Sequence, residues 1–270
     1  MQNKKVLIIG GTGTLGTALI DELLKYDVHS IRIYSRNEHK QFQVRQKYGE
    51  PTGTMRYYVG DIRDKQRLSR AYEGVDIVIN CAALKHVSLC NENPFECTQT
   101  NVIGVQNALE CAVKHGIEAF IQISTDKAVN PVNIYGCSKA MAEYLTLDAI
   151  NWQEINRTKF CVIRSGNIFA SSGSCFEVWD RQYEADKPLT VTNLNAVRYM
   201  ESKEIIAQAI INIACNVQNG LYVLSMPKYK VSDLISKYEG AEVKITGLQQ
   251  GEKLIEELYR EDEKFTLVEV

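Results

Sequence analysis

The first part of the chain alternates short apolar runs with amphipathic stretches, a pattern typical of a parallel β-sheet wrapped by helices. The expected strands are Lys5–Gly10, Ser30–Ser35, Met55–Gly60, Asp76–Cys81, Ala119–Ser124 and Phe160–Arg164. The clearest helical patterns between them are Thr14–Tyr26, Asp64–Tyr72, Phe95–Lys114 and Ile134–Trp152. The sequence therefore predicts an α/β fold built on a doubly wound parallel sheet.

The regular alternation stops after Gly166, where glycines and prolines punctuate shorter elements and one clear helix spans Ser202–Asn216. We expect residues 1–166 to form the sheet domain and residues 167–270 to form a small C-terminal lobe, both within one compact unit. Ligands of open parallel sheets bind beyond the carboxyl ends of the strands, so the lobe is expected to cover that edge.

Composition then narrows the classes of function. The 270 residues carry a formal net charge of -2, and no block of like charge suits nucleic acid or lipid headgroups. The apolar run Val6–Ile9 is too short for a membrane span or a signal-peptide core, so a cytoplasmic protein with no membrane partner is expected. None of the eight cysteines has Cys-x-x-Cys spacing and the four histidines are scattered, which predicts reduced, structural cysteines and no metal site.

A glycine-rich turn follows the first expected strand and opens the first expected helix. Its glycines Gly10, Gly13 and Gly16 are spaced Gly-x-x-Gly-x-x-Gly, and Thr12, Thr14 and Leu15 lie among them. A side chain at such a turn would keep the backbone away from a pyrophosphate, and the helix N-terminus supplies free N–H groups and a positive dipole. This context predicts a Rossmann-type dinucleotide site.

The end of the second strand bears on which dinucleotide binds. NAD-binding proteins usually place an acid there for the ribose 2′-hydroxyl, whereas this chain has Ser35 and Arg36, which suit a 2′-phosphate. We therefore favour NADP, with NAD as the alternative. Asp61, just past the third strand, has the type and position to accept a hydrogen bond from the adenine amino group, and it also suits the N-cap of the next helix.

The candidate chemistry lies after the fifth strand. Tyr135 and Lys139 are four residues apart and share one helix face, where the ammonium is expected to lower the pKa of the tyrosine and make it a usable base. The same lysine suits the nicotinamide ribose. Thr125 is placed to hydrogen-bond the reacting hydroxyl, and Asp126 and Lys127 follow it directly.

Taken together, these motifs resemble the extended short-chain dehydrogenases/reductases, and in particular the bacterial UDP-N-acetylglucosamine 4,6-dehydratases of surface-polysaccharide biosynthesis. The resemblance runs in order over nearly the whole chain, and Thr125-Asp126-Lys127 is its most specific element. Its other segments are Gly60-Asp61-Ile62-Arg63-Asp64, Ala82-Ala83-Leu84-Lys85-His86-Val87, Asn130-Pro131, Tyr135-Gly136, Arg164-Ser165-Gly166-Asn167 and Gly251-Glu252-Lys253-Leu254.

The resemblance implies a lyase cycle without net redox change. Tyr135 would deprotonate the sugar 4-hydroxyl while C4 passes a hydride to the nicotinamide. Lys127, as a neutral amine, would take the C5 proton that the 4-ketone acidifies, and a protonated Asp126 would donate to the departing 6-hydroxyl. The hydride then returns to C6. Whether C5 is inverted or retained stays undecided.

Further contacts follow from the resemblance alone. The additional cofactor-binding residues implied are Ile62, Ala82, Ala83, Lys85 and Ile168. The substrate UDP-GlcNAc would be held by Lys85, Asn167, Ser174, Arg198 and Glu252. The chain departs from relatives at Gln249-Gln250, where they commonly have Arg-Pro, and at Ala196-Val197, where they have Met-Thr, so diphosphate binding is expected to differ there.

Two other readings remain open. A UDP-sugar 4-epimerase or 4-reductase needs Tyr135 and Lys139 but not the pair Asp126 and Lys127. A regulatory Rossmann protein that senses NADP often lacks the catalytic tyrosine or lysine, whereas this chain keeps both. Helix pairs in this family usually make dimer contacts, so a homo-oligomer, either a dimer or larger, is expected.

Overall fold

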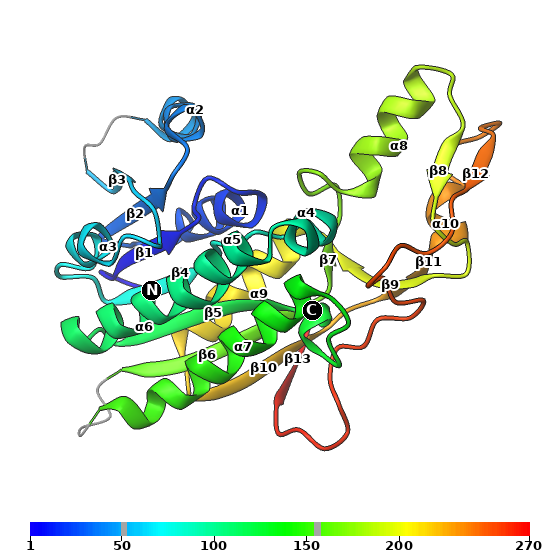
Figure 1. Cartoon of the computed structure of the whole chain (residues 1–270). Helices are drawn as coiled ribbons and strands as arrows, with labels where there is room; N and C mark the ends of the chain where they lie inside the picture. Colours follow the sequence, from blue (N-terminus) through cyan, green and yellow to red (C-terminus); the bar gives the residue numbers. More distant parts are fainter. Residues whose placement is uncertain (50–52, 154–157) are drawn as a thin grey trace.

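An eight-stranded sheet, parallel throughout, forms the framework of the protein (Figure 1). The computed structural model describes residues 1–49, 53–153 and 158–270. The strands of this sheet are β1 Lys5–Ile9, β2 Ser30–Ser35, β3 Met55–Val59, β4 Ile77–Asn80, β5 Ala119–Thr125, β6 Lys159–Ser165, β10 Gly220–Ser225 and β13 Thr266–Glu269. Their order is β3-β2-β1-β4-β5-β6-β10-β13, so the direction of winding reverses between β1 and β4. This reversal is where a doubly wound sheet opens a crevice.

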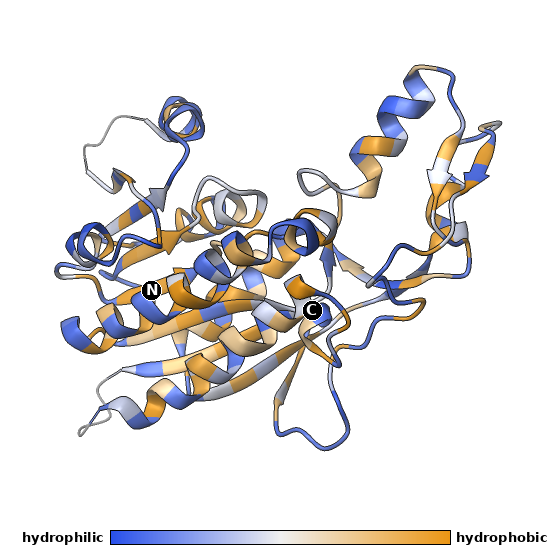
Figure 2. Cartoon of the chain, in the orientation of Figure 1, coloured by the Kyte–Doolittle hydropathy of each residue, from blue (hydrophilic) through white to orange (hydrophobic). Residues whose placement is uncertain are grey.

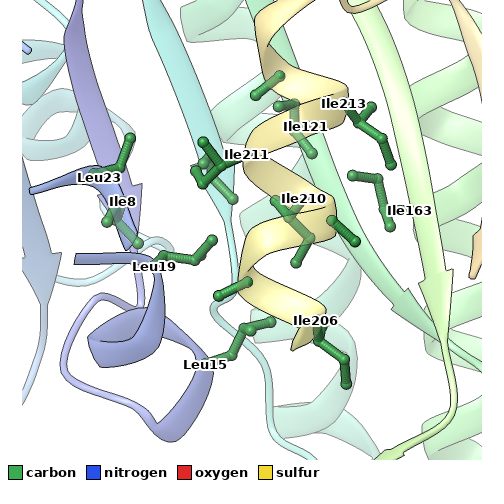
Figure 3. Packing of buried hydrophobic residues seen from close by; sticks show 14 of the residues in the cluster. Ile8, Leu15, Leu19, Leu23, Ile121, Ile163, Ile206, Ile210, Ile211 and Ile213 are labelled. Carbon is green, nitrogen blue, oxygen red and sulfur yellow. The ribbon is translucent and has the colours of Figure 1, made fainter. Parts of the chain in front are cut away.

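Helices cover both faces of the sheet. They are α1 Thr14–Leu23, α2 Glu38–Tyr48, α3 Lys65–Ala71, α4 Val87–Glu92, α5 Pro94–Thr98, α6 Gly104–His115, α7 Ile134–Asp148 and α9 Lys203–Cys215. On one face, α1 and α9 lie side by side, and their leucines and isoleucines pack on Ile8, Ile121 and Ile163 of the strands (Figure 3). On the other face, α3, α6 and α7 bury a second apolar cluster against the same strands. Figure 2 shows hydrophobic residues concentrated along the strands and hydrophilic residues on the outer helix surfaces.

Local sequence explains where several helices begin and end. The side chains of Asn37, Asp64, Asn133 and Ser202 each accept a hydrogen bond from a backbone N–H in the first turn of α2, α3, α7 and α9. Such N-caps satisfy donors that the helix itself leaves unpaired. Gly116 ends α6 with a φ of 57°, a conformation that glycine adopts without strain.

A small lobe projects beyond the carboxyl ends of the central strands (Figure 1). Its elements are β7 Asn167–Ile168, α8 Cys175–Glu184, β8 Leu189–Val191, β9 Val197–Glu201, β11 Lys228–Lys230, α10 Val231–Ile235 and β12 Val243–Ile245. The strands form two small sheets, β11-β9-β7 and β12-β8. The lobe has its own apolar core, in which Phe176, Trp179 and Leu234 are buried. It therefore packs as a unit over the sheet edge.

The expected fold class, a Rossmann-type α/β fold, is confirmed. All six expected strands and the four clearest helices are present, although Phe95–Lys114 is divided into α5, a π-helical turn at Gln99–Ile103 and α6. Short 3-10 turns also follow β5, at Asp126–Ala128, and α7, at Ala149–Trp152. Residues after 167 contribute to both parts, because α9, β10 and β13 return to the main sheet. A boundary at residue 166 therefore does not assign every later residue to the lobe, because part of the main sheet follows it.

Candidate functional site

A cleft of about 910 Å³ lies between the carboxyl ends of the central strands and the small lobe. The expected site residues that line it are Gly10, Thr12, Gly13, Thr14, Leu15, Gly16, Ser35, Arg36, Ile62, Ala82, Ala83, Lys85, Thr125, Lys127, Tyr135, Lys139, Asn167, Ile168, Ser174, Arg198 and Glu252. Asp61 and Asp126 are not among the lining residues. Thr12 and Glu252, which are 240 positions apart in the sequence, thus line the same cavity.

The glycine-rich turn has the shape that the sequence predicts. Gly10 has a φ of 82°, and a Cβ on it would lie 2.8 Å from the backbone nitrogen of Ala82. A Cβ on Gly16 would lie 2.6 Å from the Cα of Gly11, so glycine lets α1 approach the turn. No side chain caps the N-terminus of α1 at Gly13. The uncapped N–H groups and the helix dipole face the cleft, and this cradle fits a dinucleotide pyrophosphate.

The end of β2 presents positive charge to the same cleft. Arg36 is half exposed and lines the cavity together with Lys40 from α2, a helix that the sequence did not single out. The Asp61 carboxylate, expected to accept from the adenine amino group, accepts hydrogen bonds from Arg63 at 2.8–3.1 Å. Burial would raise the pKa of Asp61, but the hydrogen bonds from Arg63 outweigh it and lower that pKa. The N-cap of α3 is Asp64, so the alternative N-cap role for Asp61 is wrong.

Tyr135 and Lys139 lie one turn apart on α7 and face the carboxyl end of β5. The Lys139 Nζ donates to the carbonyl of Ile123 at 2.5 Å, and burial lowers the pKa of this lysine to about 8. Burial also raises the pKa of Tyr135, and the nearby Asp126 carboxylate acts in the same direction, whereas a hydrogen bond with Thr125 opposes it. The expectation of a lowered tyrosine pKa is therefore wrong for this structure, because desolvation of the phenol is the largest influence.

Asp126 and Lys127 form a 3-10 turn directly after β5. The Lys127 Nζ lies 3.0 Å from the Asp126 Oδ1 and 3.2 Å from the Oδ1 of Asn167, which begins β7 in the lobe. The Thr125 hydroxyl donates to the same Asp126 oxygen at 2.9 Å. Asp126 is completely buried beneath these neighbours, and its Oδ2 has no hydrogen-bond partner in the described part of the chain. An acid, an amine and a hydroxyl therefore share one contact network at the cleft floor.

The C-terminal segment, defined here as residues 252–263, crosses beneath the site and joins the lobe to the sheet. At one end, Glu252 pairs with Arg198 at 2.9 Å and accepts from the Thr192 hydroxyl at 2.9 Å. At the other end, Glu263 pairs with the buried Arg164 of β6. Arg198 and Glu252, two of the five residues expected to hold substrate, are thus each other's partners. Ion pairs therefore anchor this segment at both of its ends.

The sequence did not single out Glu256, which lies within this segment. Its side chain is 4% exposed, and its Oε1 is 3.8 Å from the Lys127 Nζ. No motif marks this position, because its burial depends on tertiary contacts, such as those with Val197 and Lys127, that lie far from it in the sequence. Only the adjacent Gly251-Glu252-Lys253-Leu254 motif indicates that the segment belongs to the site.

Among residues 1–49, 53–153 and 158–270, no helix combines the length and apolar composition that crossing a membrane requires. Their His, Cys, Asp and Glu side chains form no group of three or more that is suited to a metal ion.

Comparisons with known proteins agree with the fold and the motifs. An uncharacterized membrane protein of Methanocaldococcus jannaschii is 40% identical over 100% of this chain and 84% of its own length. A UDP-N-acetylglucosamine 4,6-dehydratase (inverting) of Campylobacter jejuni is 38% identical over 97% of this chain and 80% of its own. A UDP-glucose 4-epimerase of Rickettsia canadensis is 33% identical over 95% and 77%, respectively.

The X-ray structure of Pen from Bacillus thuringiensis superposes with a TM-score of 0.92. Its sequence is 34% identical, and the match covers 97% of this chain and 85% of that one. The family model described as "Polysaccharide biosynthesis protein" matches residues 6–270. These matches confirm the resemblance found in the motifs. The chain therefore belongs to the polysaccharide biosynthesis protein family, and a UDP-N-acetylglucosamine 4,6-dehydratase is among the proteins to which it is similar.

Proposed function

We propose that this protein is a UDP-N-acetylglucosamine 4,6-dehydratase, a hydro-lyase that forms a UDP-4-keto-6-deoxy-HexNAc. One observation carries the proposal: the Lys127 amine touches the Asp126 carboxyl at 3.0 Å beside Thr125, in the cleft that also holds Tyr135. Oxidation at C4 alone needs the tyrosine and its lysine. An additional acid and base in contact are what the loss of water across C5 and C6 requires.

The proposed division of labour follows the contacts. Tyr135 takes the proton of the sugar 4-hydroxyl, and Thr125 hydrogen-bonds the same oxygen. Lys139, held by the Ile123 carbonyl and with its pKa lowered to about 8 by burial, carries a titrating charge one helix turn from the phenol. Such a charge is able to steady a tyrosinate as it forms.

Lys127 and Asp126 act on the next step. The amine of Lys127 removes the C5 proton, and Asp126, in its protonated form, donates its own proton to the departing 6-hydroxyl. The extra proton on Lys127 then returns to Asp126 through their 3.0 Å contact, which restores both groups. Because Asp126 is completely buried, it has to turn its carboxyl toward the cleft to reach the 6-hydroxyl.

We propose NADP as the resident cofactor. The glycine cradle fits a pyrophosphate, and Ser35, Arg36 and Lys40 line the position of the adenine ribose with hydroxyl and cationic groups. The nicotinamide, when bound, accepts a hydride from C4 and returns it to C6. NAD stays the alternative, since one nearby carboxylate, Asp61, lies 3.9 Å from Arg36.

The uridine diphosphate side of the substrate belongs to the lobe. We propose that Lys85, Asn167 and Ser174 meet the sugar diphosphate and that Arg198 and Glu252 meet the phosphate and the uridine ribose. Ser174 supports this assignment, because its hydroxyl is buried at the cleft wall and has no hydrogen-bond partner among the described residues. Binding would exchange the Arg198–Glu252 ion pair for contacts to substrate.

A UDP-sugar 4-epimerase is the second candidate, favoured by the name of the Rickettsia canadensis relative. It would use Tyr135 and Lys139 in the same way and leave Lys127 as a structural cation. We further propose that the protein acts in the cytoplasm as a homo-oligomer.

The deciding experiment incubates the purified protein with UDP-GlcNAc in deuterated water and follows the products by NMR. We expect a 4-keto-6-deoxy sugar with deuterium at C5. Formation of UDP-GalNAc without loss of the 6-hydroxyl would refute the dehydratase and support the epimerase. A Lys127→Ala variant should keep its cofactor and lose C5 exchange, and full activity in that variant would contradict its role as the base.

A further inference from the structure

The loop of residues 127–135 has one proposed reacting side chain at each end, Lys127 and Tyr135. It is compact, because a Cβ on Gly136, in the first turn of α7, would overlap the carbonyl oxygen of Lys127. Asn133 is the N-cap of α7, and its Oδ1 accepts a hydrogen bond from the Gly136 N–H at 2.7 Å. Asn133 therefore fixes the start of the helix two residues before the tyrosine.

The amide nitrogen of Asn133 reaches a turn that lies 118 positions away in the sequence. This 249–252 turn, formed by those four residues, closes where the Glu252 N–H donates to the Gln249 carbonyl at 3.0 Å. The Asn133 Nδ2 donates to the Gly251 carbonyl within it at 2.7 Å. Gly251 has a φ of 83°, and a Cβ on it would lie 2.8 Å from the Cβ of Asn133, so glycine permits the close approach. One amide therefore joins the start of α7 to the 249–252 turn.

The last residue of the turn, Glu252, belongs to the wall of the cleft. Its carboxylate pairs with Arg198 at 2.9 Å and accepts from the Thr192 hydroxyl at 2.9 Å. Asn133 and Gly251 lie outside the set of described residues that line the cleft. Asn133 therefore acts on the site through the groups that it holds, and not by contact with a ligand.

Two more contacts tie the same loop to the C-terminal segment. The Lys253 Nζ donates to the Val129 carbonyl at 2.5 Å, and on the surface the Asn130 side chain donates to Glu257 at 2.9 Å. The cap of α7 is made by Asn133 and involves neither of these contacts. Of the three contacts, the bond from Asn133 is therefore the one that links the C-terminal residues directly to the start of the helix.

We propose that Asn133 is a positioning residue that sets the place of Tyr135 according to the place of Glu252. The role rests on the proposed function, in which Glu252 meets the uridine ribose and Tyr135 takes the proton of the sugar 4-hydroxyl. When substrate replaces the ion pair between Arg198 and Glu252, the 249–252 turn follows Glu252. The Asn133 amide carries that position to the first turn of α7. Contacts with the uridine, far from the reacting carbon, thereby align the phenol with the sugar.

Asn133→Asp separates the two bonds that the amide makes. Its carboxylate still accepts from the Gly136 N–H, and aspartate caps helices about as well as asparagine. An ionised carboxylate has no hydrogen for the Gly251 carbonyl, so two oxygens would meet where the 2.7 Å bond now lies. Asn133→Ser is the neutral version, because its hydroxyl also caps but is too short to reach Gly251. Asn130→Asp is the matched control, since it makes the same charge change in the same loop, at the exposed contact with Glu257.

The first measurement does not depend on turnover. Amide hydrogen exchange of the cofactor-loaded protein, read by mass spectrometry, reports on the first turn of α7 with and without UDP. In the wild type and in Asn130→Asp, saturating UDP should slow this exchange by about fivefold or more. In both Asn133 variants the slowing should be less than about twofold, although calorimetry should give UDP dissociation constants within about threefold of the wild type. Equal slowing in all four proteins, or none in the wild type, would refute the coupling.

The second measurement follows the C4 step, which a dehydratase and an epimerase share. After rapid mixing with saturating UDP-GlcNAc, the transient formation of reduced cofactor should be about tenfold slower in both Asn133 variants, while the half-saturating concentration stays within about threefold. Asn130→Asp should match the wild type in both quantities. A purely structural role would lower the rate and the affinity together, and that result, or an unchanged rate, would overturn the proposal.

The proposed function and the positioning role can fail separately. If UDP binds but UDP-GlcNAc does not react, the proposed function fails, while the exchange experiment still decides the role of Asn133. If a 4-keto product forms normally but UDP slows exchange equally in the wild type and the Asn133 variants, the proposed function stands and the positioning role is refuted. If calorimetry detects no UDP binding, both are refuted.

Discussion

Lys127, in the turn after β5, and Asn167, at the start of β7, meet across the junction of the two parts of the molecule, with Nζ and Oδ1 3.2 Å apart. The Asn167 Nδ2 donates in turn to the carbonyl of Tyr199 at 3.1 Å. The lobe thereby fixes the Asn167 amide, whose oxygen accepts a hydrogen bond from the Lys127 amine. The position of the proposed base is therefore set jointly by the sheet and the lobe.

Replacing Asn167 by aspartate tests this junction. Asn167→Asp keeps the shape and adds a negative charge about 3 Å from the amine, which stabilises the ammonium. We expect C5 exchange to fall by about tenfold at neutral pH and to recover as pH rises, while C4 oxidation changes little. The exposed Asn195→Asp is the control. A loss that is independent of pH would argue against an effect on the charge of Lys127.

The buried Lys139 should leave a signature in stability. Its pKa is about 8 in the folded protein, against an ordinary 10.5, so the unfolded chain binds more protons between these values. The free energy of unfolding contributed by Lys139 should therefore rise with pH across this window, by about 3 kcal/mol in total. Subtracting denaturant curves of Lys139→Met isolates this term, and Lys187→Met on the surface should show none. A difference that falls with pH would contradict the assignment.

Arg36 should govern the choice of cofactor. Arg36→Ala removes the cation nearest to the proposed 2′-phosphate and should weaken NADP binding by about tenfold to a hundredfold, leaving NAD binding nearly unchanged. Titration calorimetry with both dinucleotides gives the ratio. Arg181→Ala on α8 should change neither affinity. Equal losses for NAD and NADP would mean that Arg36 contributes no selectivity.

Arg164 should be a major source of stability for the site. Its guanidinium contacts Glu143 at 2.6 Å and Glu263 at 2.5 Å, and it is almost fully buried. Arg164→Met would leave Glu143 buried without a cation and Glu263 with only the more distant Arg260, so the free energy of unfolding at neutral pH should fall by about 3–5 kcal/mol. Arg260→Met, which removes a more exposed partner of Glu263, should cost less than about 1 kcal/mol. Denaturant unfolding of both variants provides the comparison.

Much of the scaffold was predictable because local pattern dictates it. The bounds of β2, Ser30–Ser35, match the apolar run that predicts it, and Gly10 and Gly16 stand where backbone crowding leaves room only for glycine. Helix α2 was not predicted, because its sequence is strongly polar and buries only Gln41 and Val44. Periodicity carries little information for such a helix.

The candidate catalytic residues could be proposed from the sequence, but their environment could not. Spacing and resemblance point to Tyr135, Lys139, Asp126 and Lys127, and the structure brings these residues together at the carboxyl end of β5. The raised pKa of Tyr135 depends on burial of its phenol in the folded protein, which no spacing reveals. Glu256 was missed for the same reason: its contact with Lys127 joins positions that only the tertiary fold brings together.

The two halves of the site also differ in when they can form. The glycine turn joins β1 to α1, which are consecutive along the chain, whereas the contacts that anchor the C-terminal segment have sequence separations of 99 residues for Arg164–Glu263 and 124 for Lys253–Val129. Closing such long loops is entropically slow, and contacts of this kind come late in folding. A partly folded chain should therefore form its glycine turn before the C-terminal segment is in place beside the acid–base cluster.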